Sequence, residues 1–145
     1  MSEEKSVVVV AEDSTPNRKI LVTLLQRMGF SVVETSDGVE AWTFMKEPKE
    51  GSKVLALITD MMMPNMGGLE LIGHCRSHEN YGSLPIVLVT AVSDRDAIVQ
   101  AKGHNVNGYM LKPIRSEVLY KKMTELFPQH AGLKAFGKNI LGKVA

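Results

Sequence analysis

The chain has 145 residues, of which 44% are hydrophobic and 23% charged, and its formal net charge is +1. This length suits a single domain with a sizeable core, and the near-neutral charge argues against a nucleic-acid-binding surface spread over the whole chain. No apolar run near the start is long enough to cross a bilayer, and the acid-rich Met1–Lys5 precedes no signal-peptide pattern. Cys75 is the only cysteine, so an intrachain disulfide is excluded and a reducing, cytoplasmic setting is expected.

The first half of the chain alternates strand-like and helix-like segments. Val7–Ala11 is typical of a fully buried strand. Ser14–Pro16 then supplies a cap and a first-turn proline for a helix that Gly29 closes. A second short strand is expected at Ser31–Thr35, and the turn at Asp37 leads into a second helix.

The second half continues the same alternation. The expected strands are Val54–Thr59, Ile86–Thr90 and Gly108–Leu111, and the expected helices are Gly68–His78, Arg95–Lys102 and about Arg115–Phe127. Five strand–helix units with mostly unalternated apolar strands indicate a doubly wound α/β fold, with helices on both faces of a five-stranded parallel sheet. In open sheets of this kind, ligands bind beyond the carboxyl ends of the strands.

Polar side chains stand at four of these carboxyl ends. Glu12 and Asp13 follow the first strand, Asp60 follows the third, Thr90 ends the fourth, and Lys112 follows the fifth. Each residue alone is more simply explained as a turn, a cap or a solvated strand end. Together, at one edge of one sheet, they supply the groups that a divalent metal and a phosphoryl group require.

Carboxylates at this edge predict a magnesium site. Mg²⁺ prefers carboxylate, carbonyl and water oxygens. Asp13 and Asp60 can bind it directly, and Glu12 can act through water or orient the shell. A backbone carbonyl just after Asp60, that of Met62, can add a further ligand. Asp60 can then attack phosphorus and form an acyl phosphate.

Two other strand ends supply groups that can bind the oxygens of the transferring phosphoryl group. The Lys112 ammonium and the metal would stabilise their charge, and Thr90 would donate a hydrogen bond. An enzyme, a phosphohydrolase of the haloacid-dehalogenase type, also uses a strand-end aspartate with Mg²⁺. That chemistry requires an acid two residues after the nucleophile, where this chain has Met62, which counts against it.

The combined motifs resemble the receiver domain of two-component response regulators. They are Glu12-Asp13-Ser14, Asp60 with Met63-Pro64 and Gly67-Gly68, Thr90-Ala91, Tyr109, and Lys112-Pro113. The resemblance covers about residues 5–127 and implies a flavodoxin-like or CheY-like sheet with strand order 2-1-3-4-5. The receiver domain is therefore expected at residues 1–127.

The resemblance also implies a role for each motif. Asp60 would be phosphorylated by a histidine kinase or a histidine phosphotransfer protein. The implied magnesium ligands are Glu12, Asp13, Asp60 and the Met62 carbonyl, and the implied phosphate contacts are Thr90, Ala91 and Lys112. Thr90 and Tyr109 would form the switch that alters the surface of the fourth helix, fifth strand and fifth helix for a downstream protein. The Lys112–Pro113 peptide is commonly cis in this family.

Such a protein would be a signalling switch that catalyses only its own phosphorylation and dephosphorylation, not an enzyme acting on a metabolite. A receiver-like module that is never phosphorylated is the other alternative, and the intact acids, Thr90 and Lys112 argue against it. The family usually has polar residues at the positions of Met62 and Val92. Their apolar side chains would lengthen the life of the acyl phosphate, unless loop geometry or a partner phosphatase dominates.

Residues 128–145 extend past the last expected helix. Apolar residues recur near helical spacing, with lysines mostly off that stripe, which predicts a short basic amphipathic helix for a membrane surface or a partner. Gly132, Gly137 and Gly142 weaken such a helix and favour a disordered or loosely docked tail instead. The segment is too short for a DNA-binding domain, so a stand-alone receiver without direct DNA binding or a transmembrane segment is expected.

Three further features have simpler explanations than a second site. His74 and His78 have a spacing that can bind zinc, but no acid or cysteine is clearly aimed at the same face, so surface histidines are expected. Met61–Met63 is expected to pack in its loop, because Mg²⁺ prefers oxygen to sulfur. Trp42 is expected in the core or just below the surface.

Overall fold

The computed structural model describes residues 5–91 and 95–144, with residues 139–144 as backbone only. Five strands form one parallel sheet in the order β2-β1-β3-β4-β5, which confirms the expected fold and strand order. The elements are β1 (Lys5–Ala11), α1 (Thr15–Arg27), β2 (Ser31–Thr35), α2 (Gly38–Lys46), β3 (Ser52–Asp60), α3 (Gly68–Ser77), β4 (Ile86–Thr90), α4 (Arg95–Lys102), β5 (Gly108–Leu111), α5 (Ser116–Leu126) and α6 (Ala131–Val144).

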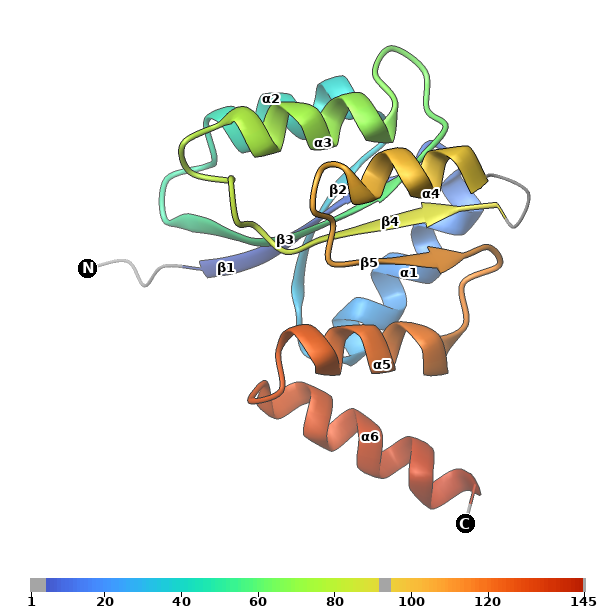
Figure 1. Cartoon of the computed structure of the whole chain (residues 1–145). Helices are drawn as coiled ribbons and strands as arrows, with labels where there is room; N and C mark the ends of the chain where they lie inside the picture. The colour runs from blue at the N-terminus through green and yellow to red at the C-terminus, as the bar shows by residue number, and fades with distance from the viewer. Residues whose placement is uncertain (1–4, 92–94, 145) are drawn as a thin grey trace.

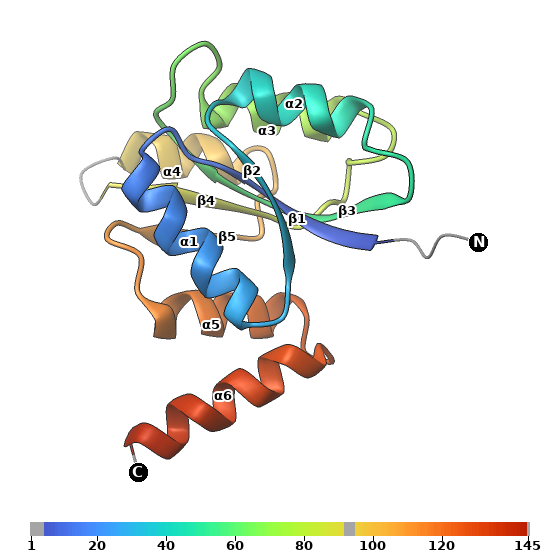
Figure 2. The ribbon, with the colours of Figure 1, turned by 180° about the vertical axis from the view of Figure 1, so that it is seen from behind.

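The sheet lies between two layers of helices. Helices α1 and α5 cover one face and α2, α3 and α4 cover the other, as the two opposite views show (Figures 1 and 2). Successive strand residues point to opposite faces, so β1 gives Val8 and Val10 to the first layer and Val9 and Ala11 to the second. Burial on both faces explains why the strands read as continuous apolar runs.

The helix starts follow the capping residues seen in the sequence. The Ser14 side chain accepts from the backbone N–H of Asn17, and Pro16 lies in the first turn of α1. The Asp37 side chain caps α2 by accepting from the N–H of Glu40 at 2.8 Å. Gly29, at φ 94°, ends the α1 turn in a conformation that favours glycine.

Strand β3 is longer than the sequence predicts. It begins at Ser52 rather than Val54 and includes Asp60. Its first residues pair with the start of β1, where Lys5 lies opposite Ser52, and the register shifts between Val7 and Val8. The polar Ser52 and Lys53 hid this extension, because backbone pairing at a strand end requires no apolar side chain.

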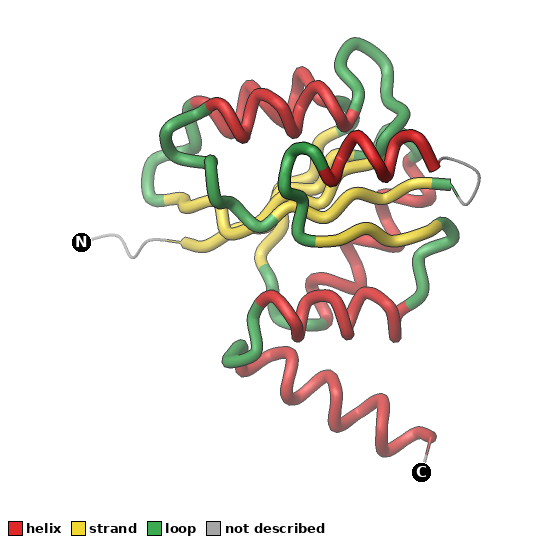
Figure 3. Tube along the Cα trace, viewed as in Figure 1, coloured by secondary structure: helices red, strands yellow, loops and turns green. Residues whose placement is uncertain are grey.

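The chain beyond α5 forms the helix α6, which packs against α5 (Figure 3). Leu133 is only 2% exposed and belongs to the same core cluster as α1 and α5. A Cβ on Gly132 would collide with the Met28 carbonyl, and one on Gly137 would collide with the Tyr120 hydroxyl. The structure therefore has a helix here in place of a disordered or loosely docked tail. In the described part of the chain no helix is long and apolar enough to span a membrane.

Candidate functional site

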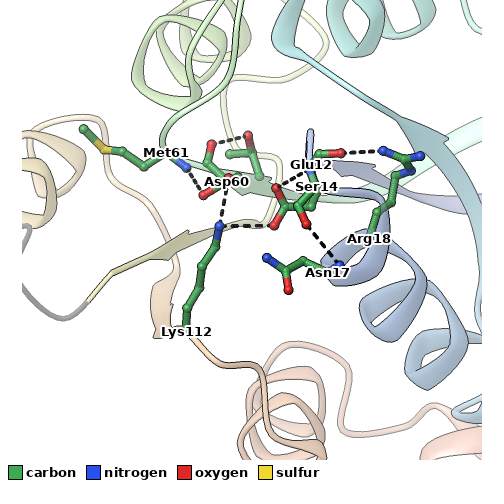
Figure 4. Close-up of polar contacts among 8 residues, drawn as sticks. Glu12, Ser14, Asn17, Arg18, Asp60, Met61 and Lys112 are labelled. Carbon is green, nitrogen blue, oxygen red and sulfur yellow. Dashed lines mark hydrogen bonds and ion pairs between the residues drawn. The ribbon is translucent and has the colours of Figure 1, made fainter.

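The sheet brings two buried acids and one lysine together at its carboxyl edge. Lys112 follows β5 and donates from Nζ to Asp60 Oδ2 at 3.0 Å. The same ammonium lies 3.2 Å from Glu12 Oε1, at the end of β1 (Figure 4). Glu12 and Asp60 are buried, at 3% and 4% exposure, so water screens their charges little. One lysine thus faces two carboxylates drawn from different strands.

A third acid completes a possible cation site. Oxygens of Glu12, Asp13 and Asp60 lie within 4.8 Å of one another, and within the described residues this is the one cluster of three or more metal-ligating side chains. Asp13 is exposed at the mouth of the cluster, and the other two acids lie beneath it. A set of hard carboxylate oxygens fits Mg²⁺ and offers no soft ligand. The expected acids therefore come together as the metal site requires.

The electrostatics also favour a cation. Burial is the largest cause that raises the pKa of Glu12 to about 7, followed by the hydrogen bond with Asp60 and the like charge of Asp60. The Ser14 N–H and the charge of Lys112 act in the opposite direction and lower this pKa. Burial alone would lower the pKa of Lys112, but its hydrogen bonds and ion pairs with Asp60 and Glu12 raise it overall. The carboxylates outnumber the ammonium, so a bound divalent cation would relieve their repulsion.

Backbone contacts orient the two buried acids (Figure 4). The N–H of Met61 donates to Asp60 Oδ1 at 2.8 Å, which leaves Oδ2 to Lys112. The N–H of Ser14 donates to Glu12 Oε2 at 3.3 Å, and Arg18 Nη1 donates to the Glu12 carbonyl at 2.8 Å. Sequence reasoning missed Arg18, since a basic residue in the first turns of a helix has no distinguishing pattern.

Thr90 ends β4 beside this cluster, and its hydroxyl is buried. It is 1% exposed, and its Oγ1 has no hydrogen-bond partner in the part of the chain that the structure describes. A buried hydroxyl without a partner destabilises the fold. The backbone N–H of Lys112 donates to the Thr90 carbonyl at 2.9 Å, so the two residues are tied together. Ala91 follows and is exposed.

The remaining expected residues lie around this pocket. The Met62 side chain is 72% exposed, so only its backbone carbonyl is a candidate ligand. Tyr109 on β5 is 44% exposed and lines a groove of about 730 Å³ between β5 and α5, together with Leu111 and Val118. The Lys112–Pro113 peptide is cis, as the resemblance implied. Val92 lies outside the described residues.

His74 and His78 contact the ring of Trp42. The half-buried Trp42 of α2 stacks on His74, with ring centroids 5.4 Å apart, and meets the edge of the His78 ring at 5.5 Å. His78 Nδ1 accepts from the N–H of Asn80. In the described ranges neither histidine belongs to a three-ligand cluster. Trp42 therefore bridges α2 and α3 below the surface, as expected.

Comparisons with known proteins agree with the fold. The profile of the response regulator receiver domain matches residues 8–124, and the chain therefore belongs to that family. The Chemotaxis protein CheY homolog of Campylobacter jejuni is 34% identical over 126 residues, covering 86% of this chain and 95% of the relative.

Solved structures show the same fold. The chemotaxis response regulator CheY4 of Vibrio cholerae has a TM-score of 0.75 and 25% identity, covering 84% of this chain and 98% of that one. The receiver domain of a sensor histidine kinase from Pseudomonas aeruginosa PAO1, with a magnesium ion coordinated in its active site cleft, also has a TM-score of 0.75. It is 20% identical and covers 86% of this chain and 99% of that one.

Proposed function

We propose that the protein is a signalling switch controlled by phosphorylation of Asp60. A histidine kinase or a histidine phosphotransfer protein supplies the phosphoryl group. The observation that carries the proposal is the 3.0 Å contact between Lys112 Nζ and Asp60 Oδ2, formed across two strands and beside two further acids. A buried carboxylate held by an ammonium at a strand end supports a role as the nucleophile toward phosphorus.

Mg²⁺ is the cofactor that the carboxylate cluster fits. Asp13, Asp60 and the Met62 carbonyl would hold it, with Glu12 acting through water or orienting the shell. When bound, it neutralises charge on the oxygens of the transferring group. The magnesium in the receiver domain from P. aeruginosa supports this assignment by analogy of fold.

The chain's own residues carry the transfer. A carboxylate oxygen of Asp60 attacks phosphorus, the bond from phosphorus to the donor nitrogen or oxygen breaks, and an acyl phosphate forms. Lys112 then exchanges its contact with Asp60 for a phosphoryl oxygen. The Thr90 hydroxyl donates to another oxygen, and the backbone N–H of Ala91 is a further donor.

The signal leaves through a change of surface. Thr90 moves toward the phosphoryl group, and the half-exposed ring of Tyr109 turns into the space it vacates. The groove between β5 and α5 then changes its affinity for a downstream protein. The named relatives are chemotaxis proteins, which favours a protein target in the cytoplasm over DNA.

Acetyl phosphate tests the proposal directly. Incubation with Mg²⁺ should add the mass of one phosphoryl group to the intact protein, and chelation of Mg²⁺ should prevent it. The substitution Asp60→Asn should abolish the added mass, and Asp96→Asn on the exposed face of α4 should not. Phosphorylation that persists in Asp60→Asn, or none in the unmodified protein, would contradict the proposal.

A further inference from the structure

The loop that follows Asp60 is hydrogen-bonded to the amino end of α2, a helix that comes earlier in the chain. We call this segment, residues 61–67, the acceptor loop. Asn65 Nδ2 donates to Asp37 Oδ2 at 2.8 Å, and the N–H of Gly38 donates to the Met66 carbonyl at 3.0 Å. Asp37 is the N-cap of α2 and Gly38 is its first residue. Asp37 and Asn65 are 28 positions apart in sequence, so these contacts are tertiary ones.

Other contacts and the local backbone conformation hold the residues on both sides of this connection in place. Asp37 Oδ1 accepts from the N–H of Glu40 as the cap of α2, and this bond, followed by the one from Asn65, lowers the pKa of Asp37. The ionised carboxylate makes the bond from Asn65 a charge-assisted one. Asn65 sits at φ 67°, a conformation that asparagine tolerates better than most residues. A Cβ on Gly38 would collide with the Met66 carbonyl, so the approach requires glycine.

The other end of the acceptor loop is fixed at the site itself. The N–H of Met61 donates to the Val89 carbonyl at 3.0 Å and to Asp60 Oδ1 at 2.8 Å. The N–H of Gly68 donates to the Met61 carbonyl at 2.9 Å. Met62 therefore lies between an anchor at Met61 and an anchor at Asn65, and its exposed side chain supplies no packing of its own.

We propose that Asp37 and Asn65 are positioning residues for the metal site. They hold the acceptor loop so that the Met62 carbonyl faces the cation bound by Asp13 and Asp60. Neither residue touches the reacting atoms; they act through the backbone between them and Met62. The inference rests on the proposed magnesium site, and it adds residues from α2 that the strand-end acids do not suggest.

Two substitutions of Asp37 distinguish the effect of its hydrogen bond to Asn65 from the effects of its helix cap and its negative charge. Asp37→Ser and Asp37→Asn both remove the negative charge, and both keep a good helix cap. Only asparagine is long enough to keep a hydrogen bond to Asn65, whose amide can turn over to accept it. Asn65→Gly removes the bond from the other side and retains the φ value.

Calorimetric titration with Mg²⁺ alone, on full-length variants shown to be folded by circular dichroism, gives the test. Mutation of a residue that contacts a metal ligand typically lowers metal affinity about 10–100-fold. Asp37 and Asn65 lie further from the metal than such residues, so we expect the Mg²⁺ affinity to fall about three- to tenfold in Asp37→Ser and in Asn65→Gly. Asp37→Asn should bind close to normally. The double variant Asp37→Ser/Asn65→Gly should be no weaker than either single one, because both remove the same bond.

Phosphorylation by acetyl phosphate gives a second measurement. Asp37→Ser should need more Mg²⁺ for its half-maximal rate and should approach the normal rate at saturating Mg²⁺. A purely structural role would lower the unfolding midpoint and leave this Mg²⁺ dependence unchanged. Equal Mg²⁺ affinity in Asp37→Ser and Asp37→Asn would overturn the inference. Normal Mg²⁺ binding without phosphorylation would overturn the proposed function alone, and no Mg²⁺ binding by the unmodified protein would overturn both.

Discussion

The two ends of the sheet differ in the kind of side chains that meet there. At the carboxyl end, Glu12 and Asp60 share one lysine, and the Thr90 hydroxyl has no partner within the described residues. At the amino end, Phe30 stacks on His130 at 4.1 Å and Leu133 is almost fully buried. The first end concentrates charged and polar groups, whereas the second is held by aromatic and apolar packing.

This difference separates the parts of the protein that stabilise it from those to which we assign the phosphorylation chemistry. Apolar burial and close packing supply stability, and buried groups without partners reduce it. Leu133, near the start of α6, adds to the stabilising contacts, and it lies far along the strands from the proposed phosphorylation site. Substitutions at the two ends should therefore affect stability and phosphorylation independently, which the following predictions test.

The largest expected effect is at the amino end. Leu133→Ala should lower the free energy of unfolding by about 2–5 kcal/mol, because it removes a buried side chain from the core cluster. Urea denaturation measures this loss, and the exposed Lys134→Ala on the same helix should change stability by less than about 0.5 kcal/mol. The phosphorylation rate of the folded Leu133→Ala protein should stay normal. A matching fall in that rate would mean that the two ends are coupled.

The next effect is a pH dependence at the carboxyl end. The pKa of Glu12 is about 7 in the folded protein, above its ordinary value of 4.5, so the folded state retains a proton that the unfolded state has lost. This stabilising contribution is complete below about pH 4.5 and disappears as the pH rises through 7. Without Mg²⁺, the free energy of unfolding should fall by about 2 kcal/mol between pH 5 and 8.

Mg²⁺ should remove much of this fall, because the cation binds the ionised carboxylates. Urea denaturation at a series of pH values, with and without Mg²⁺, measures both curves. In Glu12→Gln the slope should disappear. An equally steep slope in that variant would assign the effect to another group.

Thr90→Val should separate stability from signalling within the site. Among the described residues this buried hydroxyl has no partner, so its removal should leave the Mg²⁺-free protein as stable as before, or more stable by up to about 1 kcal/mol. Asp60 should still accept a phosphoryl group more slowly, but the environment of Tyr109 should no longer respond. The NMR signals of the Tyr109 ring, compared before and after phosphorylation, measure that response. A full response in Thr90→Val would show that the hydroxyl is not part of the switch.

The smallest effect concerns the lifetime of the acyl phosphate. Met62→Asn should speed its hydrolysis by about three- to tenfold, or on the order of 1 kcal/mol of barrier, since an amide can orient an attacking water. Release of inorganic phosphate from the phosphorylated protein measures the rate, and Met62→Leu is the apolar control. Equal rates in the two variants would discard the idea that an apolar residue at this position prolongs the phosphorylated state.

The sequence predicts the sheet and the strand-end residues well because both depend on local patterns. Continuous apolar runs locate the strands, and Asp60, Thr90 and Lys112 stand directly at or after their ends. Parallel strands bring such ends to one edge whatever the details of packing. The convergence of the acids with Lys112 thus follows from strand direction alone.

Other features depend on contacts between distant segments and could not be predicted in this way. Glycines at 132 and 137 disfavour a helix by propensity, yet each lies where α6 approaches another segment too closely for a Cβ. The burial of the Thr90 hydroxyl and the bond between Asp37 and Asn65 likewise arise only in the folded chain. A sequence pattern shows which groups are present, but not which of them meet.

The position of the single tryptophan has a practical consequence. Trp42 lies between α2 and α3, against His74 and His78, and not at the carboxyl edge of the sheet. Its fluorescence will therefore follow events in that helical layer. An optical assay of the pocket around Asp60 will need a probe introduced elsewhere, for which the exposed position of Met62 is well suited.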